Sequence, residues 1–198
     1  MKYVNQKQYP HVPYVTRTEP DDPEYEKGKT TTVASSGCGL CAAIMVADRL
    51  LPFYAFDLDD AIALSYEVNA NHGRGTSYLR FAPAFAEKLG LKVVFSKDVA
   101  DVSNCLRTGG VAVALVGAYA EGQGLFTRSG HYITIISEEP DGRFAILDPS
   151  FTDTKFEEPD RKGKVEIKND VIILCDKKTL AKEEITTRPY PYFLFWRQ

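Results

Sequence analysis

The chain has 198 residues, of which 44% are hydrophobic and 26% are charged, and its formal net charge is −3. This composition is typical of a globular protein that can bury a sizeable core, and we expect one domain over residues 1–198. The charge gives no support for nucleic acid or an anionic membrane as a partner. The sequence has neither a long apolar segment that predicts a transmembrane helix nor a signal peptide, so a cytoplasmic location is expected if the chain is complete.

Residues 1–36 are predicted to form an irregular N-terminal arm, because four prolines between positions 10 and 23 interrupt any helix. The first helix is predicted over residues 38–51, and its nearly continuous apolar surface indicates that it is buried. Ser35 and Ser36 are expected to cap this helix, which places the thiol of Cys38 among free backbone N–H groups. A thiolate is favoured at such a position, so Cys38 is a candidate nucleophile.

Helices precede strands along the rest of the chain. Asp57 is expected to cap a second helix to residue 68, and a third runs from residue 76 to its end at Gly90, with a break at Pro83 near its first turn. Short helices are expected from Ser96 or Asp98 to residue 106 and over 177–185, and strands over 91–95, 111–116, 131–137, 143–147, 165–167, 171–175 and 192–196. This order predicts an α+β fold in which N-terminal helices pack on a mainly antiparallel β-sheet.

A histidine and an aspartate stand on the two arms of a predicted hairpin. His131 opens one strand, and Asp148 ends the next strand just before a proline. With a four-residue loop over 139–142, His131 faces Ser150, and Asp148 is its diagonal neighbour on the same face, at roughly 7–8 Å between Cα atoms. A two-residue loop keeps both on one face, whereas a three-residue loop separates them. The pattern favours Cys38 as nucleophile, His131 as its base and later acid, and Asp148 as the group that orients the ring.

The segments Gly37-Cys38-Gly39, Ser129 to Thr134 and Leu147-Asp148-Pro149 together resemble the papain-like-fold cysteine peptidases of family thirty-nine. These are the bacterial double-glycine leader peptidases, which process bacteriocins, and their stand-alone relatives, whose extended VPY segment resembles residues 9–14. The resemblance implies a papain-like fold, a peptide or amide substrate, an acyl-enzyme intermediate and no cofactor or metal. It maps the catalytic residues of the family onto Cys38, His131 and Asp148.

Two features depart from that family. Its members usually carry a glutamine upstream of the cysteine that helps to form the oxyanion hole, but Thr32 stands six residues before Cys38, and neither Gln6 nor Gln8 has a sequence context that marks it as this donor. Leu40-Cys41 also replaces the Pro-Thr or Pro-Ser of the stand-alone relatives. A weak oxyanion hole would lower the catalytic rate.

Other interpretations of the same residues stay open. A catalytically weak domain that only binds peptides is one alternative, and Cys38-Gly39-Leu40-Cys41 as a thiol–disulfide oxidoreductase motif is another. The oxidoreductase interpretation lacks the strand that precedes the motif in thioredoxin-like domains. A zinc site lacks a second pair of ligands. We expect Cys41, Cys105 and Cys175 to be small buried core residues.

Overall fold

The structure is a computed structural model that describes residues 2–16, 31–73, 75–117, 124–183 and 189–198. The helices are α1 (Val33–Ser36), α2 (Cys38–Leu50), α3 (Leu58–Glu67), α4 (Tyr78–Leu89), α5 (Val99–Arg107) and α6 (Lys177–Lys182), and there are 3₁₀ turns η1 (Gln6–Gln8) and η2 (Lys155–Glu157). The strands are β1 (Leu91–Ser96), β2 (Val111–Val116), β3 (His131–Glu138), β4 (Phe144–Leu147), β5 (Val165–Lys168), β6 (Ile172–Cys175) and β7 (Tyr192–Arg197).

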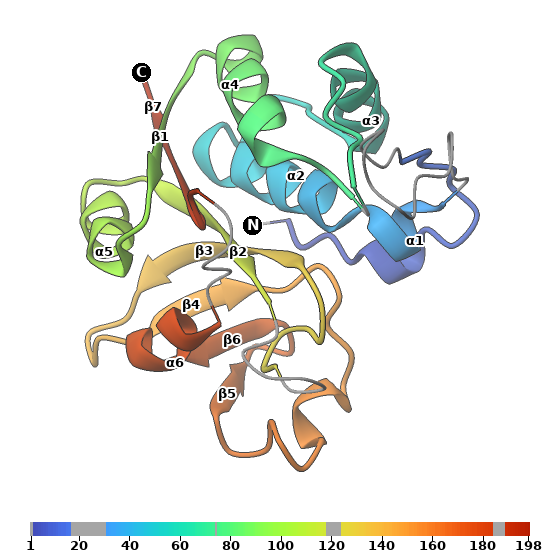
Figure 1. Cartoon of the computed structure of the whole chain (residues 1–198). Coiled ribbons are helices and arrows are strands. Elements are labelled where there is room, and N and C mark those ends of the chain that lie inside the picture. The colour runs from blue at the N-terminus through green and yellow to red at the C-terminus, as the bar shows by residue number, and fades with distance from the viewer. Residues whose placement is uncertain (1, 17–30, 74, 118–123, 184–188) are drawn as a thin grey trace.

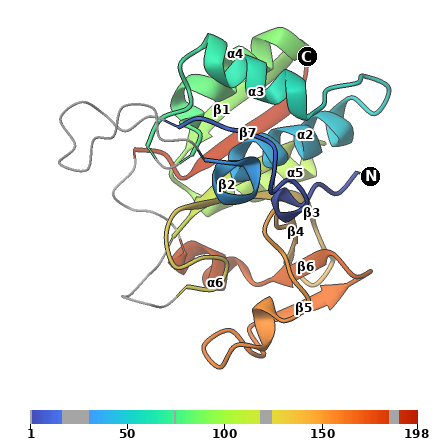
Figure 2. The ribbon, with the colours of Figure 1, turned by 90° about the vertical axis from the view of Figure 1, so that its right-hand side faces the viewer.

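The seven strands of the described chain form one antiparallel sheet in the order β1-β7-β2-β3-β4-β6-β5. Alternate residues of β2 face two separate cores, which is why this apolar strand is buried throughout. One core holds α2, α3 and α4, which lie on the same side of the sheet in Figures 1 and 2, and the other holds apolar residues of α5 and α6. The predicted α+β fold, with its antiparallel sheet, is confirmed. Within the described residues, no helix combines the length and hydropathy that spanning a membrane requires.

Two predictions about helices are wrong, one about the cap of a helix and one about a break within a helix. Ser35 and Ser36 do not cap the long helix; they belong to α1, a short helix that meets α2 at Gly37, and Gly37 itself occupies the cap position of α2. The α1 turn forms because Thr32 and Ser35 make a capping box at its own start. Pro83 does not break α4, because the buried residues Phe81 and Phe85 hold the turns on either side of it against the core.

The other helix signals are confirmed. Asp57 caps α3 through its side chain, Asp98 caps α5 in the same way, and Gly90 ends α4 in the left-handed conformation. The N-terminal arm is less irregular than predicted, since it contains η1 and α1 and a bridge between Pro13 and Thr32. Residues 1 and 17–30 of the arm, and residues 184–185 of the helix predicted over 177–185, lie outside the described residues.

The β3–β4 hairpin has the predicted register at its open end and a different one near its loop. Thr134 pairs with Leu147, as a hairpin that sets Ile133 opposite Asp148 requires, but Glu138 pairs with Phe144 and not with Arg143. The register shifts between Ile135 and Ser137, where β3 carries an extra residue. This bulge compensates for a loop that is one residue longer than predicted, so His131 and Asp148 remain on the same side of the hairpin.

Candidate active site

The candidate nucleophile stands at the junction of two helices. Cys38 is the first residue of α2 and is partly exposed, whereas the residues that follow it up to Ala47 are buried. Glycine is required on both sides of it: a Cβ at Gly37 would lie 2.5 Å from Val33 Cγ1, and a Cβ at Gly39 would lie 2.9 Å from Thr76 Cβ. The Tyr78 hydroxyl donates a 2.7 Å hydrogen bond to the Gly39 carbonyl, which fixes the start of α2.

The environment of Cys38 favours its thiolate. Burial raises the pKa of the thiol, but a hydrogen bond and the charge of His131, together with backbone hydrogen bonds from Tyr132 and Gly39, outweigh it, and the pKa lies below its ordinary value. The N-terminus of a thirteen-residue helix adds a favourable dipole at the same place. A partly exposed cysteine with a lowered pKa has the properties of a reactive nucleophile.

His131 links Cys38 to Asp148. It is the first residue of β3, and its Nε2 lies 2.7 Å from Asp148 Oδ1, in a hydrogen bond that the ring donates to the carboxylate. Because Nε2 is engaged there, Nδ1 is the ring nitrogen left for the thiol. Burial lowers the pKa of His131, but the charge and hydrogen bond of Asp148 and the contact with Cys38 raise it to about 9. The structure therefore brings all three predicted residues together in the order thiol, imidazole, carboxylate.

The Asp148 carboxylate is completely buried and has donors on both oxygens. Oδ1 accepts hydrogen bonds from the backbone N–H of Ser150 at 2.8 Å and from its hydroxyl at 3.0 Å, in addition to His131. Oδ2 accepts a hydrogen bond from Lys155 Nζ. Burial raises the pKa of Asp148, but the charges of His131 and Lys155 and their hydrogen bonds hold it well below its usual range. The carboxylate is therefore ionised at neutral pH.

The N-terminal arm is fastened to the segment that carries Asp148. The Tyr3 hydroxyl donates to the Asp148 carbonyl at 2.7 Å, the Asn5 side chain to the Phe151 carbonyl at 2.8 Å, and the backbone N–H of Gln6 to the Pro149 carbonyl at 2.7 Å. These bonds join positions more than 140 residues apart in the chain. The arm is thus part of the architecture of the site.

Gln6 has more context in space than its sequence indicates. It is only 4% exposed, and its Nε2 donates a 2.8 Å hydrogen bond to the carbonyl of Ala34, one turn before Cys38. Its Oε1 is buried and has no hydrogen-bond partner among the described residues. The sequence around Gln6 does not mark it as an oxyanion-hole donor, and only the fold places it against the turn that precedes Cys38.

The other cysteines are buried and uncharged. Cys41 is completely inaccessible, and burial together with the nearby Cys38 raises its pKa. Burial also raises the pKa of Cys105 and of Cys175 to about 12. All four cysteines are free thiols, and the described part of the chain holds no cluster of three or more potential metal ligands. The prediction that Cys41, Cys105 and Cys175 are core residues is confirmed.

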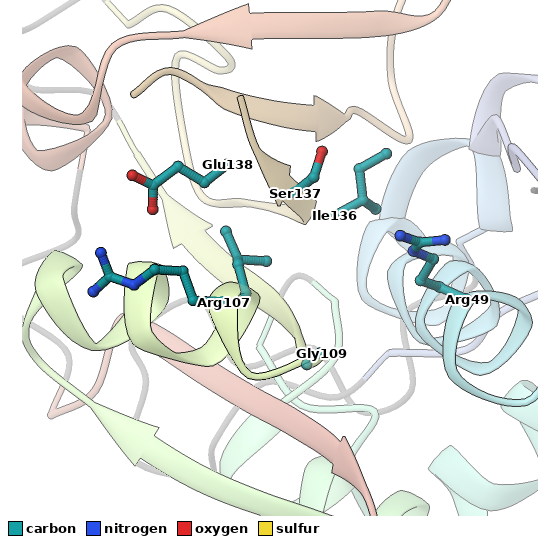
Figure 3. Close-up of a pocket in the computed structure, with 8 residues that line it drawn as sticks. Arg49, Arg107, Gly109, Ile136, Ser137 and Glu138 are labelled. Atoms are coloured by element: carbon teal, nitrogen blue, oxygen red, sulfur yellow. The ribbon is translucent and has the colours of Figure 1, made fainter. Parts of the chain in front are cut away.

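A pocket lies at the other end of β3 from His131. Ile136, Ser137 and Glu138 line it together with Arg49 and Arg107, which Figure 3 shows on two different helices. It contains none of the three residues that meet at the start of β3, so it is not the candidate active site.

No family model matches the chain, and no curated protein matches it. Among solved structures, it is similar to the peptidase domain of Streptococcus ComA, a bi-functional ABC transporter involved in a quorum-sensing pathway. The TM-score is 0.50 at 16% sequence identity, and the match covers 93% of this chain and 99% of that domain. The chain has the papain-like fold of that peptidase domain. The fold expected from the resemblance in the motifs is therefore confirmed.

Proposed function

We propose that the protein is a cysteine peptidase that hydrolyses a peptide or related amide bond through an acyl-enzyme on Cys38. The observation that carries the proposal is the continuous contact from the partly exposed Cys38 through His131 to the buried Asp148, at the start of a helix. A thiol with a lowered pKa, a base held in one orientation and a carboxylate that stabilises the imidazolium are the parts that nucleophilic acyl transfer needs.

The proposed mechanism gives each step to one residue. The Cys38 thiolate attacks the carbonyl carbon, the C–N bond breaks, and His131 Nδ1 gives its proton to the departing amine. Neutral His131 then takes a proton from water, whose oxygen attacks the thioester and releases the carboxylic acid and the thiolate. Asp148 remains ionised throughout and stabilises the imidazolium whenever His131 carries the second proton.

The proposal includes a source for the oxyanion hole. The backbone N–H groups at the start of α2 are free of intrahelical partners, and they supply one donor beside Cys38. We assign the second donor to Gln6, since its Nε2 uses one N–H for the Ala34 carbonyl and retains the other. This assignment would supply the glutamine that the family pattern requires, from an unexpected place in the chain.

The test is cleavage of a mixed peptide library, with the products identified by mass spectrometry. The wild-type protein should generate new N-termini that are absent when the Cys38→Ala variant is used at the same concentration. Cys105→Ala is the matched control, because Cys105 is equally a free thiol but lies in the core behind β2 and should not be needed for cleavage. Cleavage that persists in Cys38→Ala would refute the proposal.

The structure favours this function over the two alternatives. An oxidoreductase needs both cysteines of its CxxC motif to exchange with a substrate, but Cys41 is inaccessible and its pKa is raised. The helix α1, and not a strand, precedes the motif. A domain that only binds peptides has no use for a buried carboxylate held against His131, since burying such a charge is unfavourable unless something is gained from it.

A further inference from the structure

A buried lysine contacts the carboxylate that orients His131, and a triad of Cys38, His131 and Asp148 does not account for it. Lys155 lies in η2 and is only 7% exposed. Its Nζ donates hydrogen bonds to Asp148 Oδ2 and, at 2.7 Å, to Ser150 Oγ. Lysine is among the residues least often buried, because its ammonium loses hydration that a partner must replace.

Ser150 connects this lysine to the imidazole as well. Its Oγ lies 3.1 Å from His131 Nε2 and 3.0 Å from Asp148 Oδ1, and it accepts the hydrogen bond from Lys155. The Asp148 carboxylate is thereby held at both ends, with His131 and Ser150 on Oδ1 and Lys155 on Oδ2. A carboxylate with only one oxygen engaged could rotate about its Cβ–Cγ bond, whereas this one is fixed.

We propose that Lys155 is a positioning residue that acts on His131 through Asp148, fixing the plane of the carboxylate and sharing its negative charge with the imidazolium. The consequence for turnover rests on the peptidase activity proposed above. Since Lys155 and the His131 imidazolium share the Asp148 carboxylate, neither cation is stabilised by the whole of its negative charge. His131 is then basic enough to take the proton of the thiol and acidic enough to return one to the leaving amine.

Charged and titratable groups reach His131 from several elements. Cys38 faces it from α2 and Asp148 from the end of β4. Lys155 faces Asp148 from η2. Burial and the charge of Asp148 raise the pKa of Tyr3 in the N-terminal arm, so Tyr3 is neutral and adds no charge to the group. Burial lowers the pKa of Lys155, and the charges of Arg161 and Lys7 lower it further, whereas the charge and hydrogen bond of Asp148 raise it. Of these groups, Lys155 is the one cation that contacts Asp148 through a hydrogen bond from its side chain, apart from His131.

The experiment compares wild type with Lys155→Met by two measurements: the titration of the His131 imidazole by NMR, and steady-state kinetics on a cleaved peptide. Without Lys155, the whole charge of Asp148 acts on His131, so the imidazole pKa should rise by about one pH unit. The imidazolium then gives up its proton less readily and the carboxylate is free to turn, so kcat should fall roughly 10- to 100-fold with little change in KM. Lys162→Met, which removes an exposed charge from the same segment, should change neither.

A double-mutant comparison separates positioning from simple stabilisation. In an Asp148→Asn background, Lys155→Met should lower kcat no further, because the residue through which it acts is already gone. An additive loss, or an unmoved His131 titration in Lys155→Met, would overturn the proposal. Ser150→Ala tests the same network while the buried Lys155 and Asp148 keep each other as charged partners. It should lower kcat a few-fold if the network positions His131, and unchanged kinetics would count against it.

Failure of this proposal is distinguishable from failure of the proposed function. The His131 titration needs no substrate, and neither does alkylation of Cys38. If the wild type cleaves no peptide but Lys155→Met shifts the titration, the positioning role stands and the peptidase activity does not. If the wild type cleaves peptides and Lys155→Met changes neither measurement, the activity stands and the positioning role is refuted.

Discussion

Replacing Asp148 by asparagine tests the electrostatics of the site, because it removes one charge and little volume. Asp148, with a smaller contribution from Cys38, raises the pKa of His131 from its usual 6.5 to about 9 against the opposing effect of burial. That difference corresponds to about 3 kcal/mol, at roughly 1.4 kcal/mol for each pH unit. It falls within the roughly 3–5 kcal/mol by which breaking a buried ion pair destabilises a protein. For a chain of this size, the melting temperature of Asp148→Asn should therefore fall by roughly 6–12 °C.

The pH dependence of this loss has a defined sign. The folded pKa of His131 lies above its unfolded value, so its contribution to stability is complete below pH 6.5 and disappears as the pH rises through about 9. Thermal unfolding should show the largest gap between wild type and Asp148→Asn near pH 6 and a smaller gap near pH 10. Asp153→Asn, an exposed change in the same loop, is the control. Equal gaps at both pH values, or a gap of only about 2 °C at pH 6, would refute the reasoning.

Three further substitutions give distinct results. Gln6→Ala should lower turnover on the order of a hundredfold while leaving the alkylation of Cys38 by iodoacetamide unchanged, since alkylation forms no oxyanion; equal losses in both would contradict the oxyanion role. Cys41→Ser should lower the free energy of unfolding in urea by about 1–2 kcal/mol and leave Cys38 labelling intact. Gly37→Ala should destabilise by about 1–3 kcal/mol in the same assay, because its Cβ would overlap Val33.

The sequence was sufficient for the features that local periodicity encodes. The strand period and the parity of the hairpin placed His131 and Asp148 on the same side, and the two are hydrogen-bonded at 2.7 Å. That result depended on a bulge at Ile136, which no local signal predicted and which restores the register that a longer loop would have broken. The two glycines beside Cys38 belong to the motif that the sequence shows, and the fold needs them because a Cβ at either position would overlap a neighbour.

The features that sequence reasoning missed depend on tertiary contacts. Lys155 stands in a polar stretch that is typical of a solvated loop. It is buried only because η2 packs where the Lys155 side chain reaches Asp148. Gln6 stands 32 positions before Cys38 in the sequence, and its burial follows from three hydrogen bonds between the N-terminal arm and residues 148–151. An unpartnered buried amide oxygen is visible only in the folded chain. Motif spacing therefore identified the three candidate residues but not the residues that hold them.

The rate at which iodoacetamide alkylates Cys38, followed from pH 4 to pH 10 by peptide mass mapping, tests the central claim most directly. If His131 and the start of α2 activate the thiol, the midpoint of this profile should lie below the ordinary cysteine value of 9.0 in the wild type. It should move upward in His131→Ala, because burial then acts on the thiol without the compensating charge. A wild-type midpoint at or above 9.0, unchanged by His131→Ala, would contradict the account of Cys38 as an activated nucleophile.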